Sequence, residues 1–313
     1  MTYSEIWHRI ATSYDDGEAR AIARILIEEL FGLSYADIVC GATEQLSADD
    51  TLRLDTAVRR IEQGEPLQHV LGYADFCGNR FCVNGSVLIP RPETEWLVDE
   101  GAKLMDGCIA SDETQHKAPH SPKRILDIGT GSGCIAISLK LRLGDAYVEA
   151  WDISEEALRT AQDNADALKA EVVFRKRDAL RADNTAAPWD LIVSNPPYIC
   201  DSERSAMDDN VLLHEPHTAL FVPDDDPLRF YRAIARYALL TLNIGGSLLF
   251  ECNTRYAEAT GKMLSDMGFE EVTVSDDCFN LPRFVRGSSP SQQAAPPNPP
   301  RRGGLSYPRL RKA

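Results

Sequence analysis

Apolar residues in the first part of the chain recur at the spacing of a helix. Ile22, Leu26 and Leu30 would lie on one helical face, and Gly32 is a suitable residue to end that helix. A second run with the same period follows, and it begins with the serine and aspartate pattern of a helix start. A small helical domain is therefore predicted over residues 1–71.

The pattern changes over the next twenty residues. Short apolar runs on either side of Gly78 and Asn79 predict a β-hairpin with these two residues at its turn. Two prolines then fix an extended path before a helix that is predicted to start near Thr94. Residues 72–93 are thus expected to link the helical domain to the rest of the chain.

From Lys123 onward, short apolar runs alternate with helical segments. Such alternation predicts a mostly parallel sheet covered by helices on both faces, an α/β fold whose ligands lie at the carboxyl ends of the strands. This domain is predicted over residues 94–287, and the proline- and arginine-rich segment 288–313 is predicted to be a disordered tail. The seven predicted strands are residues 124–128, 147–152, 171–175, 190–194, 247–251, 272–275 and 283–286. The polar segment 106–122 is predicted to be a loop.

Composition limits the classes of function. The formal net charge of −15 argues against a dedicated binder of DNA or RNA, which needs a concentrated basic surface. No secretory signal is visible and no stretch is apolar for long enough to cross a bilayer, so a cytoplasmic protein without a membrane partner is predicted. The eight cysteines form no C-x-x-C pair, which favours reduced thiols over a disulfide framework or a metal site.

Four residues after the predicted strand 190–194 carry the most informative chemistry, Asn195-Pro196-Pro197-Tyr198. Proline has no N–H to continue a β-ladder, so the strand must end here. The side-chain carbonyl of Asn195 and the backbone carbonyls of Asn195 and Pro196 form a cluster of acceptors, which suits the two donors of a planar NH2 group. Tyr198 adds a flat face that could stack on that group.

The first predicted strand of the α/β domain leads into a glycine-rich loop, D-I-G-T-G-S-G at residues 127–133. Alternate glycines let the backbone approach a ligand closely. The G-x-G-x-G spacing differs from the G-x-G-x-x-G of sites that hold a dinucleotide pyrophosphate. Asp152 follows the second strand, where its carboxylate could accept from two ribose hydroxyls, and Asp178 follows the third, where an adenine edge would lie.

This combination resembles the S-adenosylmethionine-dependent methyltransferases with a seven-stranded Rossmann-like fold. The resemblance implies S-adenosylmethionine as cofactor and S-adenosylhomocysteine as product. In that family the positions of Asp127 and the glycines hold the methionine end, Asp152 matches the ribose-binding acid, and Asp178 and Ala179 match the adenine side. Some members carry a bulky aromatic residue where Ala179 stands. The expected cofactor contacts are Asp127, Gly129, Thr130, Gly131, Ser132, Gly133, Asp152, Asp178, Ala179 and Asn195.

The flanking sequence resembles a narrower family. The runs G-E-P-L-Q-H-V-L-G at 64–72, I-P-R-P-E-T-E at 89–95 and E-P-H-T-A-L at 215–220, together with N-P-P-Y, are similar to bacterial release factor glutamine methyltransferases of the HemK/PrmC type. The resemblance implies methylation of the glutamine amide (N5) in the Gly-Gly-Gln motif of class 1 peptide-chain release factors. The helical domain would then recognise this protein substrate. A monomer without a nucleic-acid substrate is expected.

Within this resemblance, Asn195, Pro196 and Tyr198 are the expected catalytic residues. No general base is assigned, because the proton can leave the nitrogen after methyl transfer. No metal is expected. The expected substrate contacts are Asn195, Pro196, Pro197, Tyr198, Phe76, Arg91 and Glu215.

Several of these residues have a purely structural alternative. Arg91 could pair with a neighbouring glutamate at the surface, Phe76 could belong to the hairpin core, and Glu215 could support a loop. Glu251, at the end of the fifth strand, could be a buried, hydrogen-bonded acid.

Three other functions remain open at this stage. An adenine-N6 methyltransferase acting on DNA or RNA would use the same N-P-P-Y motif, but it would need a basic and aromatic recognition segment. An NAD-dependent oxidoreductase could use the glycine loop, although the spacing opposes it. A non-catalytic ligand-binding adaptor would not need the intact N-P-P-Y motif.

Overall fold

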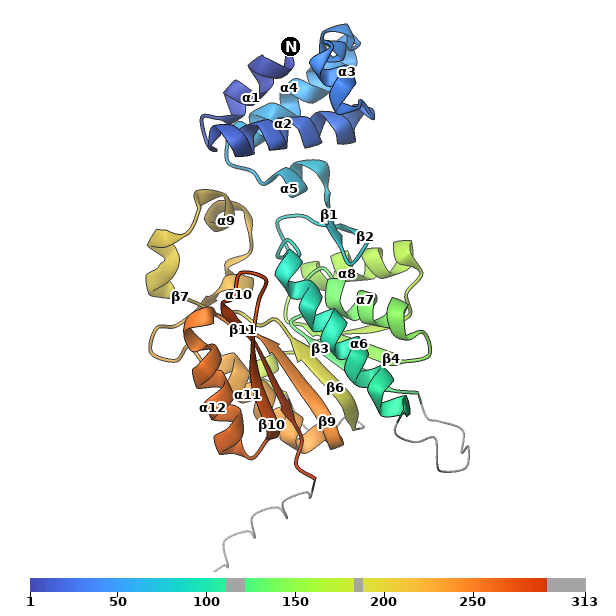
Figure 1. The fold of residues 1–313 in the computed structure, drawn as a ribbon, viewed down its shortest axis with the longest axis vertical. Helices are drawn as coiled ribbons and strands as arrows, with labels where there is room; N and C mark the ends of the chain where they lie inside the picture. Colours follow the sequence, from blue (N-terminus) through green and yellow to red (C-terminus); the bar gives the residue numbers. More distant parts are fainter. Residues whose placement is uncertain (111–121, 183–187, 292–313) are drawn as a thin grey trace, which may run out of the picture.

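The computed structural model of the protein describes residues 1–110, 122–182 and 188–291 (Figure 1). Most of the loop predicted at 106–122 lies outside the described residues, and helix α6 continues to Ala110 at its start. The predicted tail also lies outside them, apart from its first residues. Within the described part of the chain, no helix is both long and apolar enough to span a bilayer.

The N-terminal domain is helical, as predicted, and has its own apolar core. Gly32 ends α2 with a φ of 66°, a left-handed conformation that glycine adopts without strain. Ser47 caps α4 by accepting a hydrogen bond from the backbone N–H of Asp50 at 3.1 Å. The elements are α1 (Tyr3–Ile10), α2 (Asp16–Phe31), α3 (Tyr35–Val39), η1 (Ala42–Gln45), α4 (Ala48–Glu62) and α5 (Leu67–Leu71).

The predicted hairpin is formed by β1 (Tyr73–Phe76) and β2 (Asn79–Cys82). Its turn residues are Cys77 and Gly78, one position earlier than predicted. Both have positive φ, 48° and 74°, as two-residue hairpin turns require, and Asn79 is instead the first residue of β2. The hairpin leads from the helical domain to the α/β domain (Figure 1).

The α/β domain contains a seven-stranded mixed sheet in the order β10-β11-β9-β6-β3-β4-β5. The strands from β9 to β5 are parallel, and β11 pairs antiparallel with both β9 and β10. All seven predicted strands are present. Their bounds are β3 (Arg124–Ile128), β4 (Tyr147–Asp152), β5 (Val172–Lys176), β6 (Trp189–Ser194), β9 (Leu242–Glu251), β10 (Glu270–Asp276) and β11 (Pro282–Ser288).

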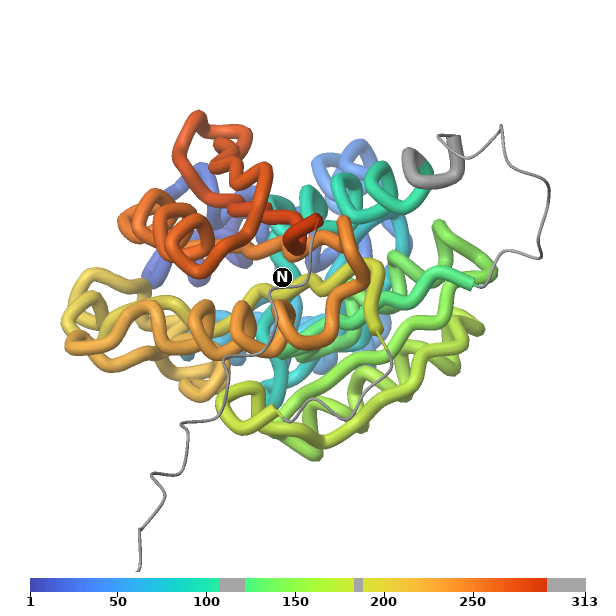
Figure 2. The backbone as a smooth tube through the Cα atoms, turned by 90° about the horizontal axis from the view of Figure 1, so that it is seen from below, coloured from blue at the N-terminus to red at the C-terminus, as the bar shows by residue number. Residues whose placement is uncertain are grey.

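Helices cover both faces of this sheet and enclose two apolar cores. The helices α6 (Glu95–Ala110), α7 (Cys134–Leu143) and α8 (Glu155–Leu168) belong to one core, and α11 (Arg229–Thr241) and α12 (Ala257–Met267) belong to the other. Seen from below, the N-terminal helices lie behind the α/β domain (Figure 2). The remaining short elements are η2 (Pro92–Thr94), η3 (Ala179–Arg181), β7 (Ile199–Cys200), η4 (Asp201–Ala206), α9 (Asp209–His214), α10 (His217–Leu220), β8 (Phe221–Val222) and η5 (Thr254–Tyr256).

Candidate functional site

A cavity of about 340 Å³ lies at the carboxyl ends of the parallel strands, where ligands of such sheets bind. The glycine loop, the segments after β4 and β5, and the N-P-P-Y motif after β6 all contribute to its wall. Six of the predicted cofactor contacts line this cavity: Gly129, Gly131, Asp152, Asp178, Ala179 and Asn195.

The glycine loop and the N-P-P-Y motif lie close together. A Cβ atom added at Gly129 would lie 3.8 Å from the backbone oxygen of Asn195. Asp152 supports the loop, because its carboxylate accepts hydrogen bonds from the backbone N–H groups of Gly131 at 3.0 Å and Ser154 at 2.9 Å. Burial raises the pKa of Asp152, and these backbone donors oppose the rise. The carboxylate is therefore held rigidly at the cavity wall.

The other four predicted cofactor contacts belong to the glycine-rich segment 127–133 but do not line the cavity. Asp127 is fully buried and accepts from the hydroxyl of Thr130 at 2.6 Å, and Ser132 is also buried. Gly133 lets the loop pack on the helices, since an added Cβ would lie 2.9 Å from Ile137 Cδ1 and 3.1 Å from Ala161 Cβ. In this structure these residues shape the loop, and a direct contact to the cofactor remains a prediction for each.

Asp127 has an unusual electrostatic state. Burial raises the pKa of its carboxyl from 3.8 to about 7, against the hydrogen bonds from the Thr130 hydroxyl and the backbone N–H of Ala136. Among the described residues, no group donates a hydrogen bond to its second oxygen, Oδ1. A buried oxygen of this kind is suited to a cationic or hydrogen-bonding ligand group, so Asp127 fits the amino end of an amino-acid ligand.

The end of the cavity near β5 combines charged and apolar residues. Asp178 caps η3 by accepting from the backbone N–H of Leu180 at 2.9 Å, and Ala179 follows it in the wall. Phe230 and Ile234 of α11 also line the cavity, and the sequence analysis did not identify them. Their spacing of four residues places them on one helical face, which is the only signal that could have indicated them.

Asn195 has one satisfied and one unsatisfied polar atom. Its Nδ2 lies 3.4 Å from the hydroxyl oxygen of Thr94, whereas its buried Oδ1 has no hydrogen-bond partner among the described residues. Pro196 and Pro197 line the cavity beside it. The backbone at the end of β6 is anchored by Ser194, whose hydroxyl donates to the carbonyl of Ile128 at 2.6 Å. A free acceptor is thus presented next to the glycine loop.

Tyr198 and Phe76 are not in the cavity wall. The ring of Tyr198 packs against the core that contains α11, and its hydroxyl lies 3.3 Å from Glu251 Oε1, so a stacking role is not favoured by this geometry. Phe76 is 1% exposed and packs edge-to-face on Phe81 in the other core. In this structure Phe76 belongs to the hairpin core, and its contact with a substrate remains a prediction.

Arg91 and Glu215 are brought together as an ion pair at 2.5 Å. Arg91 therefore does not pair with a neighbouring glutamate. The second oxygen of Glu215 accepts from the backbone N–H of Ile89 at 3.2 Å, and the Glu215 side chain is 1% exposed. Residues 86–88 and Pro216 belong to the cavity wall, so the pair fastens two of its segments. Direct substrate contact by either residue remains a prediction.

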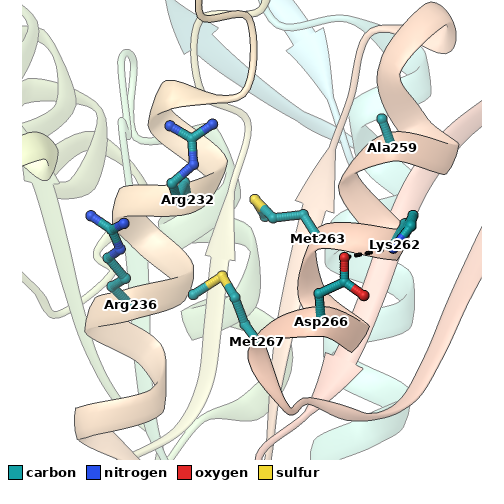
Figure 3. Close-up of a pocket in the computed structure, with 7 residues that line it drawn as sticks. All are labelled: Arg232, Arg236, Ala259, Lys262, Met263, Asp266 and Met267. Carbon is teal, nitrogen blue, oxygen red and sulfur yellow. Dashed lines mark hydrogen bonds and ion pairs between the residues drawn. The ribbon is translucent and has the colours of Figure 1, made fainter.

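A second cavity, of about 330 Å³, lies between α11 and α12 (Figure 3). None of the predicted site residues lines it, and its lining residues do not form a recognisable catalytic or ligand-binding group. Lys262 is paired with Asp266 beside it. Among the residues that the structure describes, no three His, Cys, Asp or Glu side chains form a group that could hold a metal ion. The cavity at the strand ends is therefore the candidate active site. The second cavity is lined by Arg232, Arg236, Ala259, Lys262, Met263, Asp266 and Met267.

Comparison with known proteins agrees with this assignment. Residues 8–72 match the PrmC N-terminal domain, and residues 96–220 match the methyltransferase small domain. A release factor glutamine methyltransferase from Bacteroides thetaiotaomicron is 43% identical over 273 residues, which cover 87% of this chain and 93% of that protein. The chain belongs to the release factor glutamine methyltransferase family. A second member, from Flavobacterium psychrophilum, is 36% identical over 88% of this chain and 94% of its own length.

Membership of this family identifies the protein as a methyltransferase and excludes the oxidoreductase and the non-catalytic adaptor. The fold has the seven-stranded sheet of S-adenosylmethionine-dependent methyltransferases. The solved catalytic domain of hMettl16 in complex with an RNA hairpin shares this fold, with a TM-score of 0.50 over 79% of this chain and 83% of that one. Its sequence identity is 17%, so it is similar in fold alone.

Proposed function

We propose that this protein transfers a methyl group from S-adenosylmethionine to the side-chain nitrogen N5 of a glutamine, in the Gly-Gly-Gln motif of a class 1 peptide-chain release factor. The observation that carries this proposal is the free Oδ1 of Asn195 at the cavity wall. The names of the relatives supply the protein substrate.

The residues of the cavity fit the proposed cofactor. The free oxygen of Asp127 suits its amino group, Asp152 suits two ribose hydroxyls, and the apolar side chains of Ala179 and Phe230 suit a purine ring. When bound, S-adenosylmethionine supplies an electrophilic methyl group on a sulfonium. The close approach of Gly129 to the backbone of Asn195 places the cofactor loop next to the acceptor motif.

The role of the N-P-P-Y motif follows from the chemistry of an amide. The lone pair of a carboxamide nitrogen is delocalised into the carbonyl, so the nitrogen is a poor nucleophile. Asn195 Oδ1 and the Pro196 carbonyl can accept both N–H groups of such a nitrogen, which would fix it and favour a pyramidal geometry. Positioning of this kind lowers a barrier by up to roughly 7–11 kcal/mol in favourable systems. The proton can leave to water afterwards, so no base is assigned.

The N-terminal helices are proposed to recognise the release factor, and the reaction is proposed to occur in the cytoplasm, where release factors act on ribosomes. The hairpin residue Arg80 pairs with Glu29 of α2 at 3.1 Å, which joins the helical domain to the linker. The cavity opens within an acidic protein of net charge −15, so a protein substrate is favoured over a nucleic acid. A monomer is proposed.

The test is a methyl-transfer assay with a labelled methyl donor. The protein is incubated with purified release factor, with a release factor whose Gly-Gly-Gln glutamine is replaced by alanine, and with DNA and RNA. Mass spectrometry of the Gly-Gly-Gln peptide should show a gain of one methyl group on the unaltered release factor alone. Label in nucleic acid without label in the release factor would contradict the proposal and support the adenine-N6 alternative.

A further inference from the structure

The hydrogen bonds behind Asn195 form a buried chain from η2 to β9. Asn195 Nδ2 lies 3.4 Å from Thr94 Oγ1, and Thr94 Oγ1 lies 2.7 Å from Glu251 Oε2. The hydroxyl of Tyr198 lies 3.3 Å from the other carboxylate oxygen. Thr94 and Glu251 are 3% and 2% exposed, so water does not compete for these groups.

The donors and acceptors in this chain have one consistent direction. Both carboxylate oxygens of Glu251 accept hydrogen bonds, one from Thr94 and the other from Tyr198, so Thr94 donates its single hydroxyl proton to Glu251. The lone pairs on Thr94 Oγ1 then accept from Asn195, which must offer its NH2 group. The amide of Asn195 is thereby fixed with its carbonyl oxygen away from Thr94. That oxygen is the one with no donor among the described residues.

The groups around Glu251 and Tyr198 shift the pKa values of both side chains. Burial raises the pKa of Glu251 and Glu93 adds to the rise, while the hydrogen bonds from Thr94 and Tyr198 and the positive charge of Arg283 oppose it. Burial and the charge of Glu251 raise the pKa of Tyr198 far above its ordinary value. The hydroxyl of Tyr198 therefore keeps its proton and remains a donor.

We propose that Thr94 and Glu251 are positioning residues that select one of the two orientations of the Asn195 amide. This inference rests on the proposed function, because it takes the group in front of Asn195 to be an NH2. An asparagine amide can turn by half a rotation, and the turned form would present donors to the donors of the substrate. Fixing the other form before the substrate binds removes this unproductive state.

Substitutions at Thr94 test this role. Thr94→Val removes the hydroxyl at nearly constant volume, and kcat for release factor methylation should fall about 10–100-fold, by analogy with the residues that orient metal ligands through hydrogen bonds. KM for the release factor and Kd for S-adenosylhomocysteine should change by less than about threefold, because no ligand contact is lost. Thr94→Ser keeps the hydroxyl and should retain most of kcat.

A second variant and a control complete the kinetic test. Glu251→Gln keeps the size of the side chain but can donate to Thr94 and reverse the chain, so its kcat should also fall. Thr260→Val removes a buried hydroxyl from α12, outside the cavity wall, and should leave kcat unchanged. Wild-type kcat in Thr94→Val would overturn the inference, as would equal losses in the serine and valine variants.

The orientation can also be measured without a substrate. After selective 15N-asparagine labelling, the side-chain amide signal of Asn195 is identified by its absence in Asn195→Ala. The signal should move in Thr94→Val and Glu251→Gln and stay in place in Thr94→Ser. If it does so while the wild type fails to methylate the release factor, the proposed function fails and the positioning stands. An unmoved signal in Thr94→Val, with methylation intact in the wild type, overturns the positioning alone.

Discussion

The two polar atoms of the Asn195 side-chain amide have different surroundings. The NH2 half is tied to Thr94, and the carbonyl half is unpaired in the wall of the cavity. A buried acceptor without a partner costs roughly 1–3 kcal/mol, so a protein retains one where a ligand will supply the missing donor. This cost makes Asn195 the residue for which a functional role is best supported.

Replacing Asn195 by alanine should abolish most of the methyl transfer. Loss of one preorganised group at a reaction centre lowers kcat by about 10²–10³-fold, and a loss of this size is expected for Asn195→Ala in the release factor assay. Thermal unfolding and binding of S-adenosylhomocysteine should show a folded protein that retains cofactor affinity. The matched control is Asn243→Ala. Asn243 lies at the start of β9, at the end of the sheet away from the cavity, so this variant should keep its turnover. Unchanged turnover in Asn195→Ala would remove this residue from the mechanism.

Asp127 should make the stability of the ligand-free protein depend on pH. Its pKa is about 7 in the folded protein and 3.8 without burial, so the folded state holds a proton that the unfolded chain loses. The stability that this proton contributes is fully present below about pH 4 and is lost as the pH rises to about 7. Three pKa units correspond to roughly 4 kcal/mol as an upper limit.

Asp127→Asn cannot ionise and isolates this effect. Thermal unfolding of both proteins without ligand should show that the variant gains stability relative to the wild type between pH 5 and pH 8. Other buried acids, such as Asp152, cancel in the difference because both proteins contain them. A difference in Tm that does not change with pH would show that Asp127 does not titrate in this range.

At the scale of elements, the strands could be predicted where apolar runs have clear ends. The bounds of β3 and β4 agree with the prediction to the residue. β9 begins at Leu242, five residues before the predicted start, because two glycines interrupt the apolar pattern there. Gly245 has a φ of 72° and the register with β6 shifts nearby, so the strand continues through a local irregularity that the pattern conceals.

Only those residues of the site that belong to recognisable sequence motifs could be predicted. Asn195 and Asp152 were identified because each directly follows a strand, and strand ends meet at one edge of the sheet. Thr94 was not identified as a partner of Asn195, although it belongs to the I-P-R-P-E-T-E run. The two residues are 101 positions apart, and Thr94 and Glu251 are 157 apart. Hydrogen bonds between such distant residues depend on packing, which a single sequence does not show.

Helix α11 is predicted to contribute to cofactor affinity through Phe230. Some relatives are expected to carry an aromatic residue where this chain has Ala179, and Phe230 lines the same end of the cavity. Stacking of a base on an aromatic side chain is worth about 1–3 kcal/mol, so Phe230→Ala should weaken S-adenosylhomocysteine binding about 5- to 150-fold in calorimetry. Phe279→Ala, at a 66% exposed position away from the cavity, is the control. Equal affinities of Phe230→Ala and the wild type would show that α11 only closes the cavity.

At the scale of the whole molecule, the active site depends on segments outside the parallel strands, one from the linker and one from the α/β domain. The ion pair between Arg91 and Glu215 fastens the linker to the loop after the N-P-P-Y motif, and the hairpin holds the helical domain above it (Figure 1). Removing one partner of a buried pair is destabilising because it leaves an unpaired charge. The same contacts that stabilise the fold thus also set the spacing of the cavity walls.

The C-terminal boundary of the α/β domain can be tested by truncation. The predicted boundary was residue 287, but β11 continues to Ser288, and Ser289 donates from its N–H to the carbonyl of Gly246 at 2.8 Å and from its hydroxyl to the carbonyl of Asn243. Truncation after Gly287 removes the two ladder pairs of Ser288, with Ser247 and with Glu270, and both of these bonds. At about 0.5–1.5 kcal/mol for each hydrogen bond, this loss should lower Tm by several degrees.

Truncation after Ser291 is the matched control, since it keeps every one of these bonds. It should leave both Tm and the methylation of the release factor unchanged, because β11 keeps its pairing with β9 and β10 and the cavity lies at the carboxyl ends of the parallel strands. The two truncated proteins differ by only four residues, so differential scanning calorimetry isolates the contribution of this short segment. If both unfolded at the wild-type temperature, the contacts of Ser288 and Ser289 would contribute nothing to stability. If the longer protein lost activity, residues beyond 291 would have a role in the reaction.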